Sequence, residues 1–252
     1  MEICNILPNN CISEDMPRQH YELYLTHQIL KDKERFAFLN RKSFNYKILD
    51  NSACELGEGL DFNLVLQAAE VIGAQEVVLP DLPQSSNSLS YTLKYLKDVP
   101  QDLPYKLAAV VQGETKMEIL ACAEQLLVLK RINTIMIPKW YCQMNSTNGL
   151  GRHDITKEIV RMMVSLGIKK DIHWLGLDTG MRELITPIGQ YIRSCDTGYL
   201  AAMSTPQWSY LDITDDRPRE LKINLDQMDV NMPRWNMLVK QQKNILEEVQ
   251  NV

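Results

Sequence analysis

The feature of this sequence that most limits its fold is a repeated alternation of short apolar strands with segments of helical spacing. Runs typical of strands occur at Glu2–Leu7, Tyr46–Asp50, Glu76–Asp81, Lys106–Val111, Asn133–Ile137, Asp171–Leu177 and Tyr191–Asp196. Helices are predicted at His20–Arg41, Asp61–Ile72, Gln84–Leu96, Glu114–Leu129, Asp154–Leu166 and Met181–Ile188. Such alternation indicates parallel strands joined by right-handed crossovers.

The length of 252 residues favours a closed α/β barrel of the (β/α)8 TIM type, with an open doubly wound sheet as the alternative. We expect one domain over residues 1–252, with a weak eighth strand at Leu221–Leu225 and a closing helix at Pro233–Val249. The apolar runs are too short to cross a bilayer, and the N-terminus lacks the pattern of a signal peptide. We therefore expect a cytoplasmic protein with no membrane partner.

Polar side chains follow the predicted strands, at the end of a barrel where active sites form. These residues are Asp50, Asp81, Gln112, Lys139, Asp178 and Asp196. A single acid at such a position is equally well explained as the N-cap of the next helix. Three acids together, at Asp50, Asp81 and Asp196, favour an acidic site at one mouth of the barrel.

Other common site types have weaker support. No Cys-x-x-Cys or His-x-x-x-His pair occurs, so no metal site is expected. The histidines are expected to be structural or on the surface; they are His20, His27, His153 and His173. No histidine is placed by the sequence to activate Cys54 or Cys195, and strand alternation puts Cys195 and Asp196 on opposite faces. No Gly-x-Ser-x-Gly elbow and no nucleotide-binding glycine fingerprint occurs, and we expect no cofactor.

Six segments at the ends of predicted strands occur in an order that can be compared with known families. They are Leu49–Ala53, Leu79–Asp81, Val110–Gly113, Ile135–Lys139, His173–Leu177 and Ser194–Asp196. In this order they resemble the tRNA-guanine transglycosylase superfamily, most closely the short, virus-encoded branch that installs 7-deazaguanines in DNA. The resemblance implies that an aspartate attacks the anomeric carbon of a guanosine, guanine leaves, and a 7-deazaguanine such as 7-cyano-7-deazaguanine takes its place.

By this resemblance, Asp196 is expected to be the nucleophile and Asp50 the general acid/base. The residues expected to contact the base are Asn51, Ser52, Asp81, Gln112, Gly113 and Leu177. The family's Asp-Ser-Gly-Gly-Phe-Gln stretch is replaced here by residues 50–55, Asp-Asn-Ser-Ala-Cys-Glu, which leaves the identity of the incoming base open. The zinc-binding pattern of the tRNA-modifying relatives does not occur, and this favours DNA over tRNA as the substrate.

The charge of the chain bears on the nucleic-acid hypothesis. A net charge of −5 argues against a broad basic surface but leaves room for a local basic groove. Candidates for contact with the nucleic-acid backbone are Lys139, Arg152, Arg193 and Arg234, with Trp140 and Tyr141 as stacking platforms. A solvated rim is the alternative for each. Two other functions stay open: a non-catalytic barrel that sequesters a nucleotide or base, and a nucleoside hydrolase or lyase that uses the same acids.

Overall fold

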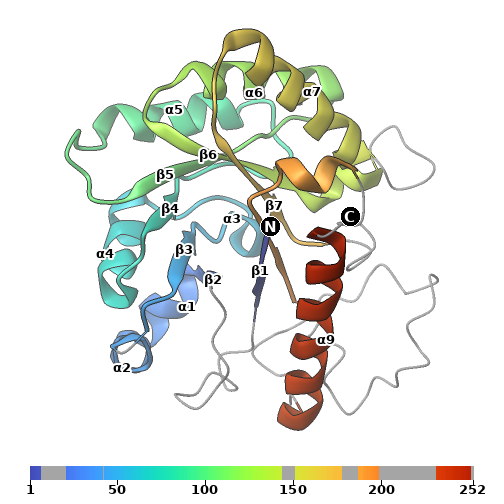
Figure 1. Ribbon diagram of the computed structural model, residues 1–252. Helices are drawn as coiled ribbons and strands as arrows, with labels where there is room; N and C mark the ends of the chain where they lie inside the picture. Colours follow the sequence, from blue (N-terminus) through green and yellow to red (C-terminus); the bar gives the residue numbers. More distant parts are fainter. Residues whose placement is uncertain (7–20, 42, 144–150, 178–186, 199–230, 251–252) are drawn as a thin grey trace.

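Eight parallel strands form a nearly closed barrel in the computed structural model (Figure 1). The strands are β1 (Glu2–Asn5), β2 (Tyr21–Leu25), β3 (Tyr46–Asp50), β4 (Glu76–Val78), β5 (Lys106–Val110), β6 (Ile132–Pro138), β7 (Asp171–Leu175) and β8 (Ser194–Thr197). Their order in the sheet is β1-β8-β7-β6-β5-β4-β3-β2. The structure describes residues 1–6, 21–41, 43–143, 151–177, 187–198 and 231–250. The predicted single-domain (β/α)8 TIM-type fold is confirmed.

Helices accompany the strands, and most of them lie on the outside of the barrel (Figure 1). They are α1 (Thr26–Lys31), α2 (Lys33–Asn40), α3 (Ala53–Leu56), α4 (Phe62–Ile72), α5 (Ser88–Asp98), α6 (Lys116–Val128), α7 (Gly151–Leu166) and α9 (Met232–Gln250). Short 3₁₀ turns occupy Lys139–Gln143 and Pro187–Tyr191. Local sequence explains several helix starts, since Thr115 and Glu118 form a reciprocal capping box at α6 and Asp61 caps α4. Among the helices described, none has the length and apolar character needed to span a membrane.

The strands alternate between two hydrophobic clusters. An outer cluster, between the strands and the helices, contains Leu49, Val77 and Ala109, whereas an inner cluster inside the barrel contains Ile48, Val78 and Ala108. Consecutive strand residues thus pack on opposite sides, as the strand period of two requires. The inner cluster is the packed centre of the barrel and separates its two ends.

A polar layer closes the barrel at the N-terminal ends of the strands. Arg193, which directly precedes β8, binds Glu76 through two hydrogen bonds of 2.8 and 3.2 Å and also reaches Asp171 at 3.1 Å. Tyr46 donates a further hydrogen bond of 2.7 Å to Glu76. Burial disfavours the ionised form of Glu76, but the charge and hydrogen bonds of Arg193 outweigh burial and hold the pKa of Glu76 below its usual value. Arg193 is therefore held in a largely buried ion pair at this end.

The helix predicted at His20–Arg41 was wrong for residues 21–41, the part of it that the structure describes. Instead of one long helix, this segment contains strand β2 followed by helices α1 and α2. β2 takes the eighth place in the sheet, which the sequence predicted for Leu221–Leu225, a segment outside the described residues. Strand β8 begins at Ser194 rather than at Tyr191, because residues 187–191 form a 3₁₀ turn. Most of the helix predicted at Met181–Ile188 also lies outside the described residues.

Candidate functional site

Three acids from separate strands gather at the C-terminal end of the barrel. Asp50 is the last residue of β3, Asp81 lies three residues beyond β4, and Asp196 lies in the second half of β8. All three are buried, with 9%, 2% and 6% of their surface exposed. Asp50 lies within electrostatic range of the other two, whose negative charges both raise its pKa. The structure thus brings together the three predicted acids, while Asp178 lies outside the described residues.

Asp196 is anchored through one carboxylate oxygen. Its Oδ1 accepts a hydrogen bond of 3.0 Å from the backbone N–H of Gly176 and lies 3.1 Å from Nε2 of His173. Among the residues that the structure describes, no donor reaches Oδ2 of Asp196. One oxygen is therefore fixed by the end of β7, and the other receives no hydrogen bond from the described part of the chain.

His173 was expected to be a structural or surface residue, and it lies beside Asp196 inside the barrel. The register explains the contact: His173 pairs with Ser194, and Asp196 lies two residues further along β8 on the same face. Nδ1 of His173 is 2.8 Å from the hydroxyl of Ser194. These residue types also form the triad of serine hydrolases, but there the serine contacts Nε2 and the aspartate Nδ1. Here the contacts are reversed, and Ser194 is fully buried, so it is not placed to attack a substrate.

Asp50 belongs to a strained turn at the end of β3. Its Oδ1 accepts a hydrogen bond of 2.7 Å from the backbone N–H of Ser52. Ser52 has a φ of 64°, in the left-handed region that glycine favours, and it precedes the short helix α3. Burial is the main reason that the pKa of Asp50 is raised well above its usual value, with the charge of Glu55 adding to it. Asp50 thus retains a proton to higher pH than an ordinary aspartate.

Asp81 is held between two amide side chains. Asn51 donates to its Oδ1 at 2.7 Å, and Gln112 donates to its Oδ2 at 2.6 Å. The orientation of each amide is also fixed, because the carbonyl oxygen of Asn51 accepts from the N–H of Ala53 and that of Gln112 accepts from the hydroxyl of Tyr141. Burial raises the pKa of Asp81 to about 6, although both amides oppose the shift. Asp81 therefore presents a rigid carboxylate with remaining acceptor capacity.

The other residues predicted to contact a base differ in their placement. Gly113 packs so closely against α6 that an added Cβ would lie 2.8 Å from the backbone nitrogen of Ile119. Leu177 is buried in the outer hydrophobic cluster. Gly176, its neighbour, has a φ of 66°, and a Cβ there would lie 2.9 Å from the side chain of Lys139. Gly176 is a site residue that the sequence reasoning did not identify, and its backbone N–H holds Asp196.

The expected backbone contacts are dispersed over the molecule. Arg193 lies in the polar layer at the opposite end of the barrel, which is a correction to its predicted place in a nucleic-acid interface. Arg152 is fully buried and donates to the carbonyls of Leu175 and Gly176, so it braces the end of β7. Lys139 is exposed beside the site, and its positive charge lowers the pKa of Cys54 against a larger effect of burial.

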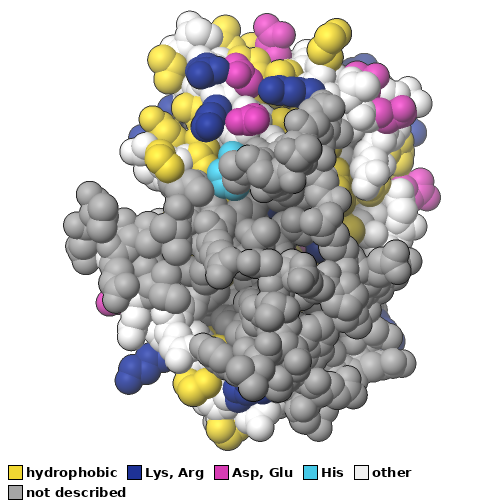
Figure 2. Space-filling view, turned by 90° about the vertical axis from the view of Figure 1, so that its right-hand side faces the viewer, with side chains coloured by type: hydrophobic (Ala, Val, Ile, Leu, Met, Phe, Trp, Pro, Cys, Tyr) yellow, Lys and Arg dark blue, Asp and Glu magenta, His cyan; other side chains and the backbone are white. Residues whose placement is uncertain are grey.

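The aromatic candidates also differ in their exposure. Tyr141 is fully buried and supports Gln112, so it offers no stacking face, whereas Trp140 is half-buried. Arg234 lies on α9, whose Gln242 accepts a hydrogen bond of 2.8 Å from Asn5 at the end of β1. Figure 2 shows one face of the molecule, and on its described part Lys and Arg side chains lie among acidic and hydrophobic ones. The described part of that face is therefore mixed in charge.

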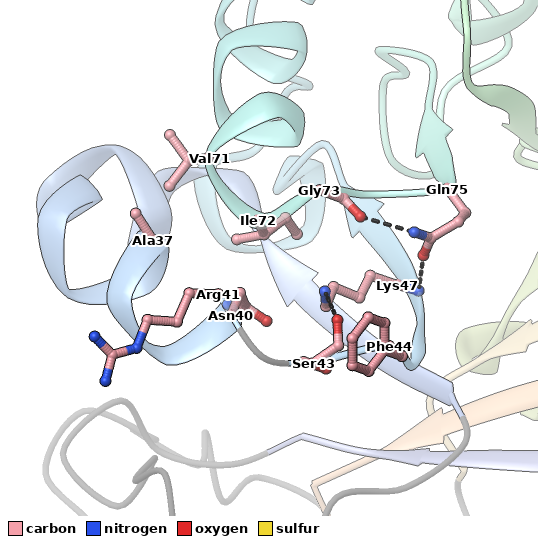
Figure 3. A pocket seen from close by; sticks show the side chains of 10 residues that line it. All are labelled: Ala37, Asn40, Arg41, Ser43, Phe44, Lys47, Val71, Ile72, Gly73 and Gln75. Atoms are coloured by element: carbon pink, nitrogen blue, oxygen red, sulfur yellow. Dashed lines mark hydrogen bonds between the residues drawn. The ribbon is translucent and has the colours of Figure 1, made fainter.

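A hollow elsewhere on the barrel lacks the features of the acidic site. It lies between α2, the start of β3 and the turn before β4, near the N-terminal ends of those strands (Figure 3). Lys47 and Gln75, which line it, are engaged by Ser43 and Gly73. None of the predicted site residues lines this hollow. Among the described residues, no group of His, Cys, Asp and Glu is arranged to hold a metal ion.

Comparison with known proteins adds no functional assignment. No family model and no curated protein matches the chain. Among solved structures, the chain is similar to the crystal structure of RipC from Yersinia pestis, with a TM-score of 0.45 and 10% sequence identity. That similarity covers 71% of this chain and 83% of the other. A similarity at this level gives no information about the activity of this protein.

Proposed function

We propose that this protein is a base-exchange transglycosylase that replaces guanine in a polynucleotide with a 7-deazaguanine. The observation that carries the proposal is that three buried acids at one barrel end have different environments. Asp196 has one oxygen fixed and one without a hydrogen bond from the described residues, Asp50 has a raised pKa, and Asp81 is held by two amides. A nucleophile, a proton donor and a base-recognising acceptor are what the reaction requires.

The reaction follows from these environments. The available oxygen of Asp196 attacks C1′ of the guanosine, and the bond from C1′ to N9 breaks as the glycosyl ester forms. Asp50 gives its proton to the departing guanine. The incoming deazaguanine then returns a proton to Asp50, forms a bond to C1′ through its ring nitrogen and releases Asp196. A raised pKa suits Asp50 to both proton transfers near neutral pH.

Asp81 is placed to select the base. Both of its oxygens keep lone pairs after the hydrogen bonds from Asn51 and Gln112, so it accepts from a ligand and, when ionised, does not donate. Guanine presents two adjacent donors on its Watson–Crick edge, whereas adenine presents a donor beside an acceptor. A buried acceptor left without a partner is costly, which supports discrimination against adenine.

The turn at Ser52 supports the family resemblance from which this reaction is taken. In the family's Asp-Ser-Gly-Gly-Phe-Gln stretch, the third position is glycine, and Ser52 occupies that position here. Its φ of 64° is a conformation that glycine adopts readily and serine rarely. The local backbone therefore suits the family pattern although the residue has changed.

DNA is the substrate that we propose, with tRNA second, and an internal target base would have to leave its stack to reach buried acids. The test incubates the protein with DNA labelled in guanine, with and without 7-cyano-7-deazaguanine. We expect at most one guanine per protein to be released without the deazabase, as the covalent intermediate forms, and repeated release only with it. Both are expected to be lost in Asp196→Asn and retained in Asp98→Asn, an exposed acid on α5. Repeated release without the deazabase would favour hydrolysis, and tight base binding without release would favour sequestration. Replacing the DNA by tRNA in a parallel reaction decides between the two polymers.

A further inference from the structure

A line of hydrogen bonds crosses the barrel from its closed end to Asp196. It begins at Arg193, whose guanidinium is clamped by Glu76 and Asp171. Nε of Arg193 donates to the hydroxyl of Ser194 at 3.2 Å. That hydroxyl lies 2.8 Å from Nδ1 of His173, and Nε2 of the same ring lies 3.1 Å from Oδ1 of Asp196.

The partners of each group decide which way the protons point. Arg193 can only donate, so the oxygen of Ser194 accepts from it and the hydroxyl hydrogen is free to point to His173. Nδ1 of His173 then accepts, which leaves the hydrogen of the neutral ring on Nε2. Nε2 donates to the carboxylate of Asp196, which can only accept when it is ionised. Hydrogen bonds are therefore donated in one direction, from Arg193 through Ser194 and His173 to Asp196.

We infer that Arg193 and Ser194 fix His173 as its Nε2–H tautomer, and that His173 thereby positions Asp196. The inference rests on the proposed function in treating Asp196 as the nucleophile, but the hydrogen-bond line itself does not depend on any activity. His173 is a positioning residue, because it touches only the oxygen of Asp196 that is also held by Gly176. The rigid ion pair at the N-terminal end of the barrel thus sets the orientation of the acid at the C-terminal end.

Burial makes this arrangement effective. His173 and Ser194 are fully buried, so no bulk water competes for their hydrogen bonds. With the other tautomer, Nε2 would present a lone pair to the carboxylate oxygen 3.1 Å away, and the contact would become repulsive. A carboxylate held at a fixed angle attacks with less loss of entropy than a freely rotating one.

The first experiment reads the tautomer without any substrate. Protein labelled with ¹⁵N-histidine is compared with His173→Gln to assign the ring, and the spectrum reports which nitrogen carries the hydrogen. We expect the wild-type ring to be protonated on Nε2 and not on Nδ1. In Ser194→Ala, a fraction of the Nδ1–H form should appear. An Nδ1–H ring in the wild type, or a tautomer ratio unchanged in Ser194→Ala, would overturn the inference.

The second experiment compares two amide substitutions of His173, to asparagine and to glutamine, in the exchange assay. The side-chain nitrogen of glutamine can occupy the place of Nε2, whereas asparagine reaches only the place of Nδ1. We expect His173→Asn to lower kcat roughly 10- to 100-fold with little change in KM, since it removes a hydrogen bond to a charged group. His173→Gln should restore most of kcat. Equal losses in both variants would contradict positioning through Nε2. Absence of exchange in the wild type, with the Nε2–H tautomer present, would instead count against the proposed function alone.

Discussion

The environment of Asp81 leads to a measurable dependence of stability on pH. Its pKa is about 6 in the folded protein, against an ordinary value of 3.8, and burial is the main cause. The folded state therefore binds this proton more tightly than the unfolded state does. The stabilisation is fully present below about pH 4 and is lost as the pH rises through about 6. The full shift from 3.8 to about 6 corresponds to about 3 kcal/mol between strongly acidic pH and pH well above 6.

Replacing Asp81 by asparagine removes the titration but keeps the shape of the side chain. The substituted amide would offer one acceptor to two amide donors, so a constant loss of about 1–3 kcal/mol is also expected. This loss does not vary with pH, and the change with pH is therefore the quantity to read. We expect the free energy of unfolding of wild type minus that of Asp81→Asn to fall by about 2.4 kcal/mol between pH 4 and pH 7.

The assay is urea unfolding of both proteins at half-unit steps across this range, followed by circular dichroism. Asp98→Asn serves as the matched control, because Asp98 is an exposed acid near the end of α5. The control is expected to follow the wild-type curve within about 0.5 kcal/mol at every pH. A constant difference between wild type and Asp81→Asn from pH 4 to pH 7 would refute the account of the Asp81 environment.

Substitutions at three further positions test other parts of the structure by urea unfolding at pH 7. Glu76→Gln leaves Arg193 without its main buried partner and is expected to cost about 3–5 kcal/mol; a loss below about 1 kcal/mol would contradict the buried ion pair. Gly176→Ala, at a φ of 66°, should cost about 1–2 kcal/mol and reduce exchange activity by moving the N–H that holds Asp196. Ser52→Val should cost about 2 kcal/mol or more, whereas Ser52→Gly should stay within about 1 kcal/mol; equal losses would refute strain at this turn.

Strand–helix alternation was sufficient to predict the barrel but not every strand. Residues 21–25 read Tyr-Glu-Leu-Tyr-Leu, and Tyr21, Leu23 and Leu25 face the inner cluster with strand periodicity. The sequence pattern favours a helix here because β2 runs directly into α1 with no glycine, proline or turn between them. Over five residues, apolar positions that continue into a helix fit both the strand period of two and the helix period of about 3.6. The missing strand became visible only through its pairing with β3.

The sequence was sufficient to predict where the acids of the site lie, but not which residues they contact. Each acid lies at or just after the end of a predicted strand, and parallel strands end on the same side of a barrel. These positions were sufficient to predict that Asp50, Asp81 and Asp196 lie at one mouth. The partners of these acids depend on register between neighbouring strands, which one sequence does not specify. The contact between His173 and Asp196 follows from the pairing of His173 with Ser194. Long, flexible side chains were the least predictable, and Arg193 is held at the other end of the barrel by Glu76.

In the proposed reaction, Asp196 forms a covalent bond to the sugar of a guanosine in DNA. The most direct measurement incubates the protein with an end-labelled, guanine-containing oligonucleotide and separates the products under denaturing conditions. We expect a labelled protein–DNA adduct in wild type and in Asp98→Asn, its discharge on addition of 7-cyano-7-deazaguanine, and its absence in Asp196→Asn. An adduct that persists in Asp196→Asn, or base exchange that is retained in Asp196→Ala, would contradict the claim.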